Sequence, residues 1–467
     1  MEDTSTTRRV AVLVATCSSF LTPFMGSSLN IALPSIGREF SVGALVLGWI
    51  STAYLLASAM FLVPFGKLAD LRGRKRIFVW GLVVYGVGSL LSGLAPSVGT
   101  LIAARVVQGV GGAMIFGTGV AILTSVFPPQ ERGRVLGLNV AAVYVGLSVG
   151  PFLGGVLTQQ WGWRSIFFLN VPLAALIAAL AAWKLRGEWR AGNGEGFDWA
   201  GSVLYGLGLV ALIYGFSRLP SAFGAALTLA GILVLALFAL WEGRARTPVL
   251  ELGLFRRNPA FTFSNLAALI NYSATSAVGF LLSLYLQSVR GVNPQQAGLI
   301  LLAQPVVQAL FSPLAGWASD RVEPRIVAST GMGLTVVGLA MLYPLASSTA
   351  IPYIIGVLAL LGFGFALFSS PNTNAVMSSV DRSHYGVASA TLATMRLTGQ
   401  MLSMGIVMLI FALFMGGTAV TPQTAPRFLT SVRAAFSVFV VLCFLGVFAS
   451  LARGNIRAQP APVVQSR

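Results

Sequence analysis

The segment GKLADLRGRKR, residues Gly66 to Arg76, is the most informative stretch of the chain. It lies between two apolar runs that are each long enough to cross a membrane as a helix. Gly66 is expected to open a turn, and five basic residues crowd the same loop, so the segment must lie at a membrane surface. A weaker copy, GWASDRVEPR from Gly316 to Arg325, follows another apolar run about 250 residues later. Two copies of one loop predict two related halves.

The composition of the chain is that of a membrane protein. Hydrophobic residues make up 56% of the sequence and charged residues only 9%, whereas a soluble domain carries roughly 25% charged residues. The net charge of +17 does not indicate nucleic acid binding, because the basic residues are scattered through loops instead of gathered on one face. The lipid bilayer is therefore the expected environment.

The cysteines and the N-terminal residues exclude two further readings. Cys17 and Cys443 lie in apolar runs far apart in the sequence, which is typical of packed hydrophobic residues and not of a disulfide framework or a metal site. We therefore expect no metal and no cofactor. Arg8 and Arg9 precede a long apolar run without a small-residue cleavage site, so we expect a retained first helix and not a removed signal peptide.

The sequence contains 14 apolar runs long enough to span a bilayer, which takes about 20 helical residues. Helices satisfy the backbone polar groups within each segment, and these continuous runs do not alternate as the strands of a membrane barrel do. The runs fall near residues 10–33, 44–65, 77–95, 98–126, 135–158, 165–184, 199–217, 222–241, 259–287, 294–316, 326–346, 350–371, 386–415 and 430–452.

The distribution of basic residues predicts the orientation of these helices. An even number of spans places both termini on one side. The loops and tails of that side hold 22 of the 30 Lys and Arg residues, against six in the loops of the other side. Because basic loops stay in the cytoplasm, we expect a multi-pass protein of the cell (cytoplasmic) membrane with both termini cytoplasmic.

Two long polar connections divide the chain. Residues 185–198 are Gly-rich and of mixed charge, and residues 242–258 carry six charged side chains. The two helices between them read as an insert, and without it each charged loop follows the second helix of a six-helix half. We therefore divide the chain into an N-terminal bundle, an insert with its linkers, a C-terminal bundle and a disordered cytoplasmic tail, at residues 1–184, 185–258, 259–452 and 453–467.

Eight motifs in chain order carry a family resemblance. They resemble motifs of the major facilitator superfamily, in its fourteen-helix drug:proton antiporter branch. The resemblance implies an all-α integral membrane protein with two six-helix bundles plus two inserted helices, which exports small amphipathic or lipophilic compounds by alternating access. The motifs are GKLADLRGRKR (Gly66–Arg76), RVVQGVGGA (Arg105–Ala113), GLSVGPFLGG (Gly146–Gly155), WGWRSIFFLNVP (Trp161–Pro172), DWAG (Asp198–Gly201), LELGLFRRNPAF (Leu250–Phe261), NPQQAGL (Asn293–Leu299) and SSPNTNAVM (Ser369–Met377).

Small residues form a stripe on the fifth predicted helix. Gly146, Gly150 and Gly154 are four residues apart, so they lie on one face, and Pro151 can kink the helix there. Small residues let helices approach closely. The stripe is therefore either ordinary tight packing or a flexible seam between the two halves, which alternating access requires.

The charged loops are candidate gates. Asp70 and Arg74 are four residues apart and can form an ion pair if the loop is helical. The resemblance implies that Gly66, Asp70 and Arg74 latch the cytoplasmic side, and a plain solvated cluster that fixes topology is the alternative. Asp320 would act similarly in the second half, although Glu323 and the proline after it depart from the family pattern.

Two arginines lie inside predicted spans. Arg105 shares a helix face with Gln108, and Arg396 lies one turn before Gln400. A charge at that depth costs roughly 2.5–3.5 kcal/mol on insertion scales, so each arginine should face a cavity or a partner, or snorkel towards a helix end. Other polar residues within the spans either line the cavity or form helix–helix hydrogen bonds: Asn30, Asn271, Tyr272, Gln304, Gln308, Asn372 and Asn374.

The usual coupling carboxylate is missing from the first helix. The antiporters that this chain resembles carry an aspartate shortly before an Asn-x-Ala-Leu-Pro segment, which here is NIALP (Asn30–Pro34). Met25 stands at the aspartate position and takes no proton, and none of the 13 acidic residues falls in the middle of a predicted span. Proton coupling stays open, with Asp70 as the carboxylate nearest to the pathway. An apolar cavity edged by arginine and amides favours neutral lipophilic or anionic substrates.

We expect a transporter and not an enzyme. Intramembrane catalysis needs converging nucleophiles, acids or metal ligands, and the predicted spans offer no acid and no histidine. The expected partners are the lipid bilayer and a small amphipathic or lipophilic substrate, with protons left open and nucleic acid excluded. One chain suffices for a pathway between two bundles, so we expect a monomer. The alternative function is a transporter or facilitator of a lipid or an anionic metabolite.

Overall fold

The computed structural model describes residues 2–190, 196–245, 248, 252–380, 385–416, 418–421 and 423–455. Within these ranges every regular element is helical. The elements are α1 (Glu2–Phe40), α2 (Ala44–Arg72), α3 (Arg74–Gly93), α4 (Val98–Val126), α5 (Pro129–Trp161), α6 (Arg164–Lys184), α7 (Trp199–Arg218), α8 (Ala222–Glu242), α9 (Leu252–Arg257), α10 (Pro259–Thr275), α11 (Val278–Leu284), η1 (Tyr285–Val289), α12 (Pro294–Leu301), α13 (Ala303–Arg321), α14 (Pro324–Met341), α15 (Ile351–Ser378), α16 (Tyr385–Phe414) and α17 (Ala425–Ala452).

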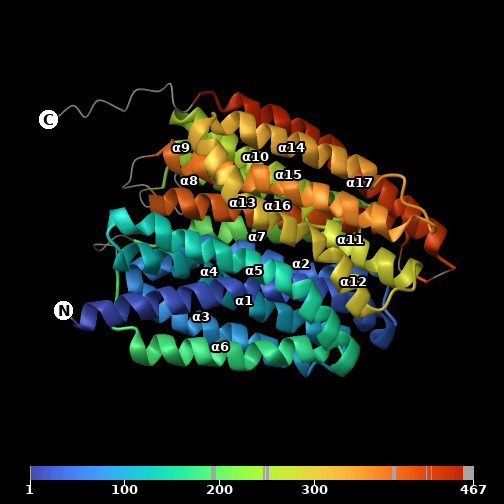
Figure 1. Ribbon diagram of the computed structural model, residues 1–467, viewed down its shortest axis with the longest axis horizontal. Helices are drawn as coiled ribbons and strands as arrows, with labels where there is room; N and C mark the ends of the chain where they lie inside the picture. Colours follow the sequence, from blue (N-terminus) through green and yellow to red (C-terminus); the bar gives the residue numbers. More distant parts are fainter. Residues whose placement is uncertain are drawn as a thin grey trace.

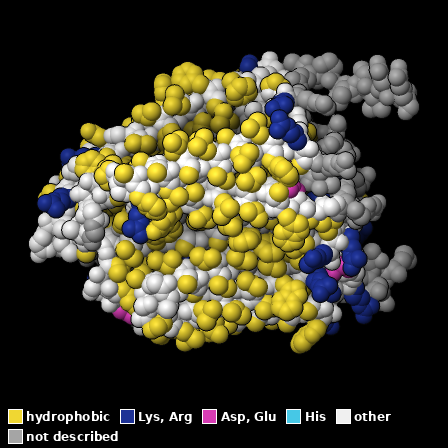
Figure 2. All heavy atoms as spheres, turned by 180° about the vertical axis from the view of Figure 1, so that it is seen from behind, with side chains coloured by type: hydrophobic (Ala, Val, Ile, Leu, Met, Phe, Trp, Pro, Cys, Tyr) yellow, Lys and Arg dark blue, Asp and Glu magenta, His cyan; other side chains and the backbone are white. Residues whose placement is uncertain are grey.

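The described residues contain 14 helical stretches that are long and apolar enough to cross a membrane. This confirms the helix count and the all-α fold class predicted from the sequence. The helix α1 begins and α17 ends at the same end of the molecule (Figure 1), as an even number of crossings requires. Hydrophobic side chains cover the middle of the face seen in Figure 2, and most Lys and Arg side chains on that face lie towards its two ends.

The helices form two bundles and an inserted pair. In Figure 1, α1 to α6 lie together in one half of the molecule, and α10 to α17 lie together in the other. In the first bundle α1 packs on α5 and α4 packs on both α2 and α3, whereas in the second α15 packs on α13 and α14. The inserted helix α7 contacts α2 of one bundle and α16 of the other, and α8 packs on α7. The residue ranges assigned to these parts stay a prediction.

Two of the spans are divided into shorter elements, which the sequence did not predict, although Leu302 in the second of them keeps helical dihedral angles. The span Pro259–Val289 consists of α10, α11 and η1, and the span Pro294–Arg321 consists of α12 and α13. At the first break, the backbone N–H of Ala277 donates to Ser403 Oγ of α16 (3.0 Å), so a side chain replaces the usual helical acceptor. Broken helices beside a bundle interface are common in transporters because neighbouring helices satisfy the freed backbone groups.

The turn in the first charged loop lies at Gly73 and not at Gly66. The sequence led us to expect Gly66 to open the turn, but α2 continues through it to Arg72. Gly73 has a φ of +118°, a conformation that residues with a Cβ rarely adopt. Because a glycine inside a helix costs only about 1 kcal/mol relative to alanine, Gly66 can stay helical while Gly73 makes the sharp reversal into α3.

The segment after α6 is docked on this turn. The backbone N–H of Arg74 donates to Trp189 O, and the backbone N–H of Lys75 donates to Glu188 Oε1, both at 2.9 Å. A Cβ at Gly73 would lie 2.5 Å from the Glu188 carboxyl carbon, so the missing side chain makes room for the acid. The first linker of the insert is therefore attached to the N-terminal bundle at its charged loop.

The first residue of the predicted C-terminal tail, Arg453, packs against the helix before it. Arg453 was assigned to a disordered tail, but its side chain is buried against the end of α17 and donates from Nε to Ser450 O (2.8 Å). Burial lowers the pKa of Arg453 to about 10. Residues 456–467, which make up most of the predicted tail, lie outside the described residues.

Candidate functional site

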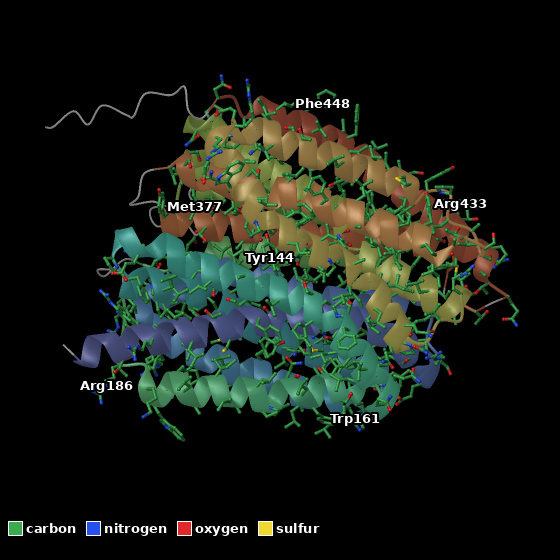
Figure 3. The ribbon with its side chains drawn as sticks, in the orientation of Figure 1. Tyr144, Trp161, Arg186, Met377, Arg433 and Phe448 are labelled. Atoms are coloured by element: carbon green, nitrogen blue, oxygen red, sulfur yellow. The ribbon has the colours of Figure 1, made fainter. Side chains whose placement is uncertain are left out.

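The two bundles are joined at the end of the molecule where α1 ends and α2 begins. Ser283 of α11 donates a hydrogen bond to Asn30 O of α1, and Gln287 Nε2 of η1 donates to Ile31 O at 2.9 Å. Thr52 of α2 donates to the Met408 sulfur of α16 at 3.2 Å. These three contacts connect the first bundle to the second, so this end of the seam is closed. Figure 3 places Trp161 and Arg433 at the same end.

Backbone contact closes the same end of the seam between α5 and α12. A Cβ added to Gly155 would lie 2.6 Å from Pro294 O, well inside contact distance. A Cβ added to Gly298 would clash with Pro151 O. Because the two helices meet through these glycines, Pro151 lies in the seam between the halves.

A polar cluster lies further along the boundary between the bundles. Figure 3 shows Tyr144 of α5 where the two halves face each other, and its Oη lies 3.5 Å from Ser369 Oγ of α15. Arg396 of α16 donates to Thr373 Oγ1 at 2.6 Å, and its guanidinium lies 5.7 Å from the ring centroid of Tyr272. We call Tyr144, Tyr272, Ser369, Thr373 and Arg396 the interface cluster.

Several polar atoms near the interface cluster lack protein partners. Arg396 Nε, Asn372 Oδ1 and both amide atoms of Asn271 are buried without a hydrogen bond. Among the described residues, the ion pairs do not include Arg396. Unpaired buried polar atoms are costly, and a cationic side chain without an acid can accept an anionic or strongly polar ligand group. The arrangement can therefore bind such a group between the two bundles.

Arg105 lies inside the first bundle and not at the boundary. Its side chain is 1% exposed. Nε donates to Ile50 O of α2 at 3.2 Å, Nη1 donates to Gln108 Oε1, and the guanidinium lies 4.4 Å from the Tyr54 ring centroid. The structure thus brings Arg105 and Gln108 together on α4, as their spacing predicts, and gives the arginine a backbone partner and an aromatic partner on α2.

Met25 is packed in the same bundle. It is 1% exposed, and Asn170 Nδ2 of α6 lies 3.2 Å from its sulfur. Asn170 Oδ1 is buried without a partner. The position at which the resembling antiporters carry an aspartate therefore holds an apolar side chain beside an amide, and no proton-binding group stands there.

Asp70 and Arg74 form the ion pair that their spacing suggests, at 2.7 Å between Arg74 Nη2 and Asp70 Oδ1. Arg74 Nη1 also donates to Ala121 O at 3.1 Å and to Ser125 Oγ at 2.5 Å, both in α4. The pair therefore ties α2, α3 and α4 together within one bundle. In the second bundle Asn374 Nδ2 contacts Asp320 Oδ1 at 3.4 Å.

The glycine stripe of α5 packs against α1 of its own bundle. A Cβ at Gly146 would lie 2.5 Å from Phe20 O, and one at Gly154 would lie 2.7 Å from Ser28 Cα. Gly150 faces α1 as well, and its backbone oxygen accepts a hydrogen bond from Ser28 at 2.8 Å. Of the two readings left open by the sequence, the geometry matches tight packing within one bundle.

The remaining predicted residues are spread over the second bundle. Gln308 is buried in α13, and its backbone oxygen accepts from Ser312. The backbone of Gln304 packs against Gly362 of α15. Gln400 is half-buried, one turn from Arg396, and the backbone oxygen of Asn30 accepts a hydrogen bond from Ser283 at the closed end. The structure therefore brings Tyr272 and Arg396 together and leaves these other residues apart.

Three members of the interface cluster were missed in the sequence. Tyr144 lies in an apolar run, where an aromatic residue is expected to pack in the hydrophobic core. Ser369 and Thr373 belong to the SSPNTNAVM motif, so the motif was the available signal, but only its asparagines were singled out. In the described part of the chain, no three His, Cys, Asp or Glu side chains converge to hold a metal ion.

Comparisons with known proteins agree with this architecture. A family model described as Major Facilitator Superfamily matches residues 15–263 and 264–466. The riboflavin transporter RibZ of Clostridioides difficile is 29% identical over 82% of this chain and 84% of its own length. The multidrug resistance protein Stp of Mycobacterium tuberculosis is 31% identical over 88% of this chain and 77% of its own. A bacterial homologue of the human lysosomal transporter Spinster, solved in an inward-facing and unoccupied conformation, superposes with a TM-score of 0.70 at 16% identity, covering 98% of this chain and 99% of that one.

Proposed function

Because the chain belongs to the major facilitator superfamily, we propose that this membrane transporter exports small amphipathic compounds that are neutral or anionic. The substrate would pass between the two bundles as the protein alternates between states open to either side. The relationship to a multidrug resistance protein over 88% of the chain supports export of drug-like compounds.

The observation that carries the proposal is the unpaired Arg396 at the boundary of the bundles. Its described contacts are Thr373 Oγ1 and the Tyr272 ring, neither of which neutralises its charge. Tyr144 and Tyr272 add aromatic surface from both bundles, which suits the apolar part of an amphipathic molecule. A cationic substrate would be repelled at this place, and an anionic group would gain a charge-assisted hydrogen bond.

The proposed access route opens on the side where α1 begins. The inter-bundle hydrogen bonds of Ser283 and Gln287 close the opposite end, and the interface cluster lies between that closure and the side of the termini. The basic loops suggest that this side is the cytoplasm of the cell. A substrate would thus enter from the cytoplasm or the inner leaflet and meet Arg396 on its way out.

We further propose that transport does not depend strictly on a proton gradient. Met25 replaces the acid that the resembling antiporters carry in the first helix, and it is packed against Asn170. Asp70 is already paired with Arg74 at 2.7 Å and ties helices within one bundle. Neither position supplies a free carboxylate along the seam.

The test uses the purified protein in proteoliposomes with two fluorescent dyes of similar size, one an organic anion and one a lipophilic cation. We expect the anionic dye to be transported without an imposed pH gradient, and Arg396→Gln to slow its transport about tenfold, the effect of losing roughly 1.4 kcal/mol of binding. Arg396→Lys keeps the charge and should retain more activity. Arg433→Gln, which removes an arginine at the closed end, is the matched control.

Two results would contradict the proposal. One is a preference for the cationic dye together with a strict need for the pH gradient. The other is transport of the anionic dye by Arg396→Gln at the wild-type rate. Equal losses in Arg396→Gln and Arg433→Gln would show a general effect of charge and would also count against the site.

A second candidate is facilitated transport of an anionic metabolite, without export of foreign compounds. The absence of an ionisable side chain at Met25 favours it, because a facilitator needs no coupling group. Counterflow distinguishes the two functions. Metabolite preloaded inside the vesicles should accelerate uptake of the labelled compound for a facilitator of that metabolite, and drug-like anions should not compete.

A further inference from the structure

A cavity of about 380 Å³ lies outside the seam, beside the first charged loop. Two arginines line it: Arg72 is the last residue of α2, and Arg76 lies in the first turn of α3. The next turn of α3 supplies Ile77 and Trp80, and α4 supplies Met114. The cavity thus runs from two basic side chains at the helix ends towards an apolar wall formed by α3 and α4.

The acidic groups near the cavity are occupied by other partners. Asp70 is paired with Arg74, which is also bound to α4. Glu188 accepts the backbone N–H of Lys75 at 2.9 Å. Among the described residues, the ion pairs include neither Arg72 nor Arg76, and both side chains are exposed. The two arginines therefore present their positive charge to the cavity and its surroundings.

The apolar wall extends from the arginines into the depth of the bilayer. Trp80 lies four residues after Arg76 on α3, about 6 Å further along the helix axis, and its side chain is 55% exposed. Ile77 and Met114 form a small buried cluster with Ala69. Tryptophan is enriched where the headgroups of a membrane meet the hydrocarbon region, so the charged end of the cavity lies at headgroup level.

We propose that this cavity binds an anionic phospholipid of the adjacent membrane leaflet. Arg72 and Arg76 would bind the phosphate, and the glycerol backbone and the start of an acyl chain would lie against Ile77, Trp80 and Met114. A free phosphate ion would use only the two arginines and leave the apolar wall without a partner. Three of the five lining residues are apolar, which favours a ligand that carries both a charge and a hydrocarbon chain.

The position of the cavity gives the lipid a structural role. Arg72 and Arg76 flank the turn at Gly73, to which Glu188 and Trp189 of the first linker are attached. A lipid bound to both arginines would join the end of α2 to the start of α3 on the outer side of the same turn. It would also reduce the repulsion between the basic residues of the loop.

The experiment measures lipids bound to the purified full-length protein by native mass spectrometry, with phosphatidylglycerol, phosphatidylcholine and inorganic phosphate as the probes. We expect phosphatidylglycerol to bind in preference to phosphatidylcholine, and the double variant Arg72→Gln/Arg76→Gln to bind it about thirtyfold more weakly, which corresponds to about 1 kcal/mol per arginine. Arg72→Lys/Arg76→Lys keeps the charge and should bind within a few-fold of the wild type.

The matched control is Arg190→Gln/Arg244→Gln, which removes two exposed arginines from cytoplasmic linkers outside the cavity. Unchanged melting in detergent without added lipid shows that the variants are folded. Equal weakening by the control pair would overturn the proposal in favour of nonspecific surface attraction. Competition by inorganic phosphate at equal concentration would show an ion site and not a lipid site, and equal binding of both lipids would show that the arginines do not select the headgroup.

Discussion

At the scale of single residues, the two arginines that lie well inside apolar spans, Arg105 and Arg396, have different surroundings. Arg105 is held inside one bundle by Ile50 O, Gln108 and the Tyr54 ring, and all these partners belong to the first bundle. Arg396 has one hydroxyl and one ring as described partners and lies at the boundary of the bundles. A structural arginine and a substrate-binding arginine should therefore respond differently to substitution.

We expect Arg105→Ala to destabilise the protein and to abolish transport. The variant leaves Ile50 O and Gln108 Oε1 without their donor, and an interhelical hydrogen bond such as the one to Ile50 contributes about 1–2 kcal/mol within a membrane. Arg105→Lys can replace one donor and should lose less. Thermal unfolding in detergent and transport in proteoliposomes measure the two effects.

Two results would contradict the structural role of Arg105. If Arg105→Ala melts at the wild-type temperature and transports normally, the contacts to Ile50 and Gln108 contribute little. If Arg396→Gln lowers the melting temperature as much as Arg105→Ala does, the distinction between a structural and a substrate-binding arginine is wrong.

At the scale of the elements, close approach of α1 and α5 depends on Gly146 and its neighbours in the stripe. A Cβ at Gly146 would lie 2.5 Å from Phe20 O, so Gly146→Leu must push the two helices apart. Overpacking of this kind typically costs 1–3 kcal/mol. We expect Gly146→Leu to lower the melting temperature and the yield of folded protein.

The same helix supplies the control. Gly137 also lies in α5, and nothing is within 4 Å of a Cβ added there. Gly137→Leu should therefore leave melting nearly unchanged, although the residue type and the added volume are the same. A similar loss in both variants would mean that adding a leucine anywhere on α5, and not contact with α1, explains the effect.

The number of membrane spans could be predicted from the sequence, but the packing partners of the helices could not. Hydropathy and the basic loops predict the fourteen spans, because length and charge bias are properties of each segment alone. The partner of the glycine stripe could not be predicted, since a smooth helix face packs equally well within a bundle or between bundles. The interruption near Ala277 was not predicted for a similar reason, because mean hydropathy is a property of the whole span and does not show where its backbone leaves the helix.

The candidate site was predictable only in part. Arg396 and Tyr272 stand out as polar residues in apolar runs, and the structure places them together. Tyr144 reaches them from the other bundle, and no pattern in one segment reveals a contact across a seam. The turn was misplaced for a local reason, since Gly66 and Gly73 are both glycines of one short loop and only the backbone shows which one leaves the helix.

At the scale of the whole molecule, the closed end of the seam should be sensitive to a single methyl group. Gly298 of α12 meets Pro151 O of α5 so closely that a Cβ cannot be accommodated. Gly298→Ala should therefore weaken the closure and shift the population away from this state. We expect faster hydrogen–deuterium exchange in α11 and α12 and transport reduced several-fold.

Gly333→Ala is the control for this prediction. It adds the same methyl group to α14 at a place where nothing lies within 4 Å of the Cβ. Exchange and transport should match the wild type. Unchanged exchange in Gly298→Ala would show that the contact between α5 and α12 does not hold the bundles together.

The docking of Glu188 on the turn at Gly73 has an evolutionary consequence. The acid occupies the volume that any side chain at position 73 would need, and it binds the backbone beside that position. We therefore expect the two positions to change together among relatives, although they lie 115 positions apart in the sequence. A lineage that replaced the glycine would displace the acid, and the acid would then be free to drift.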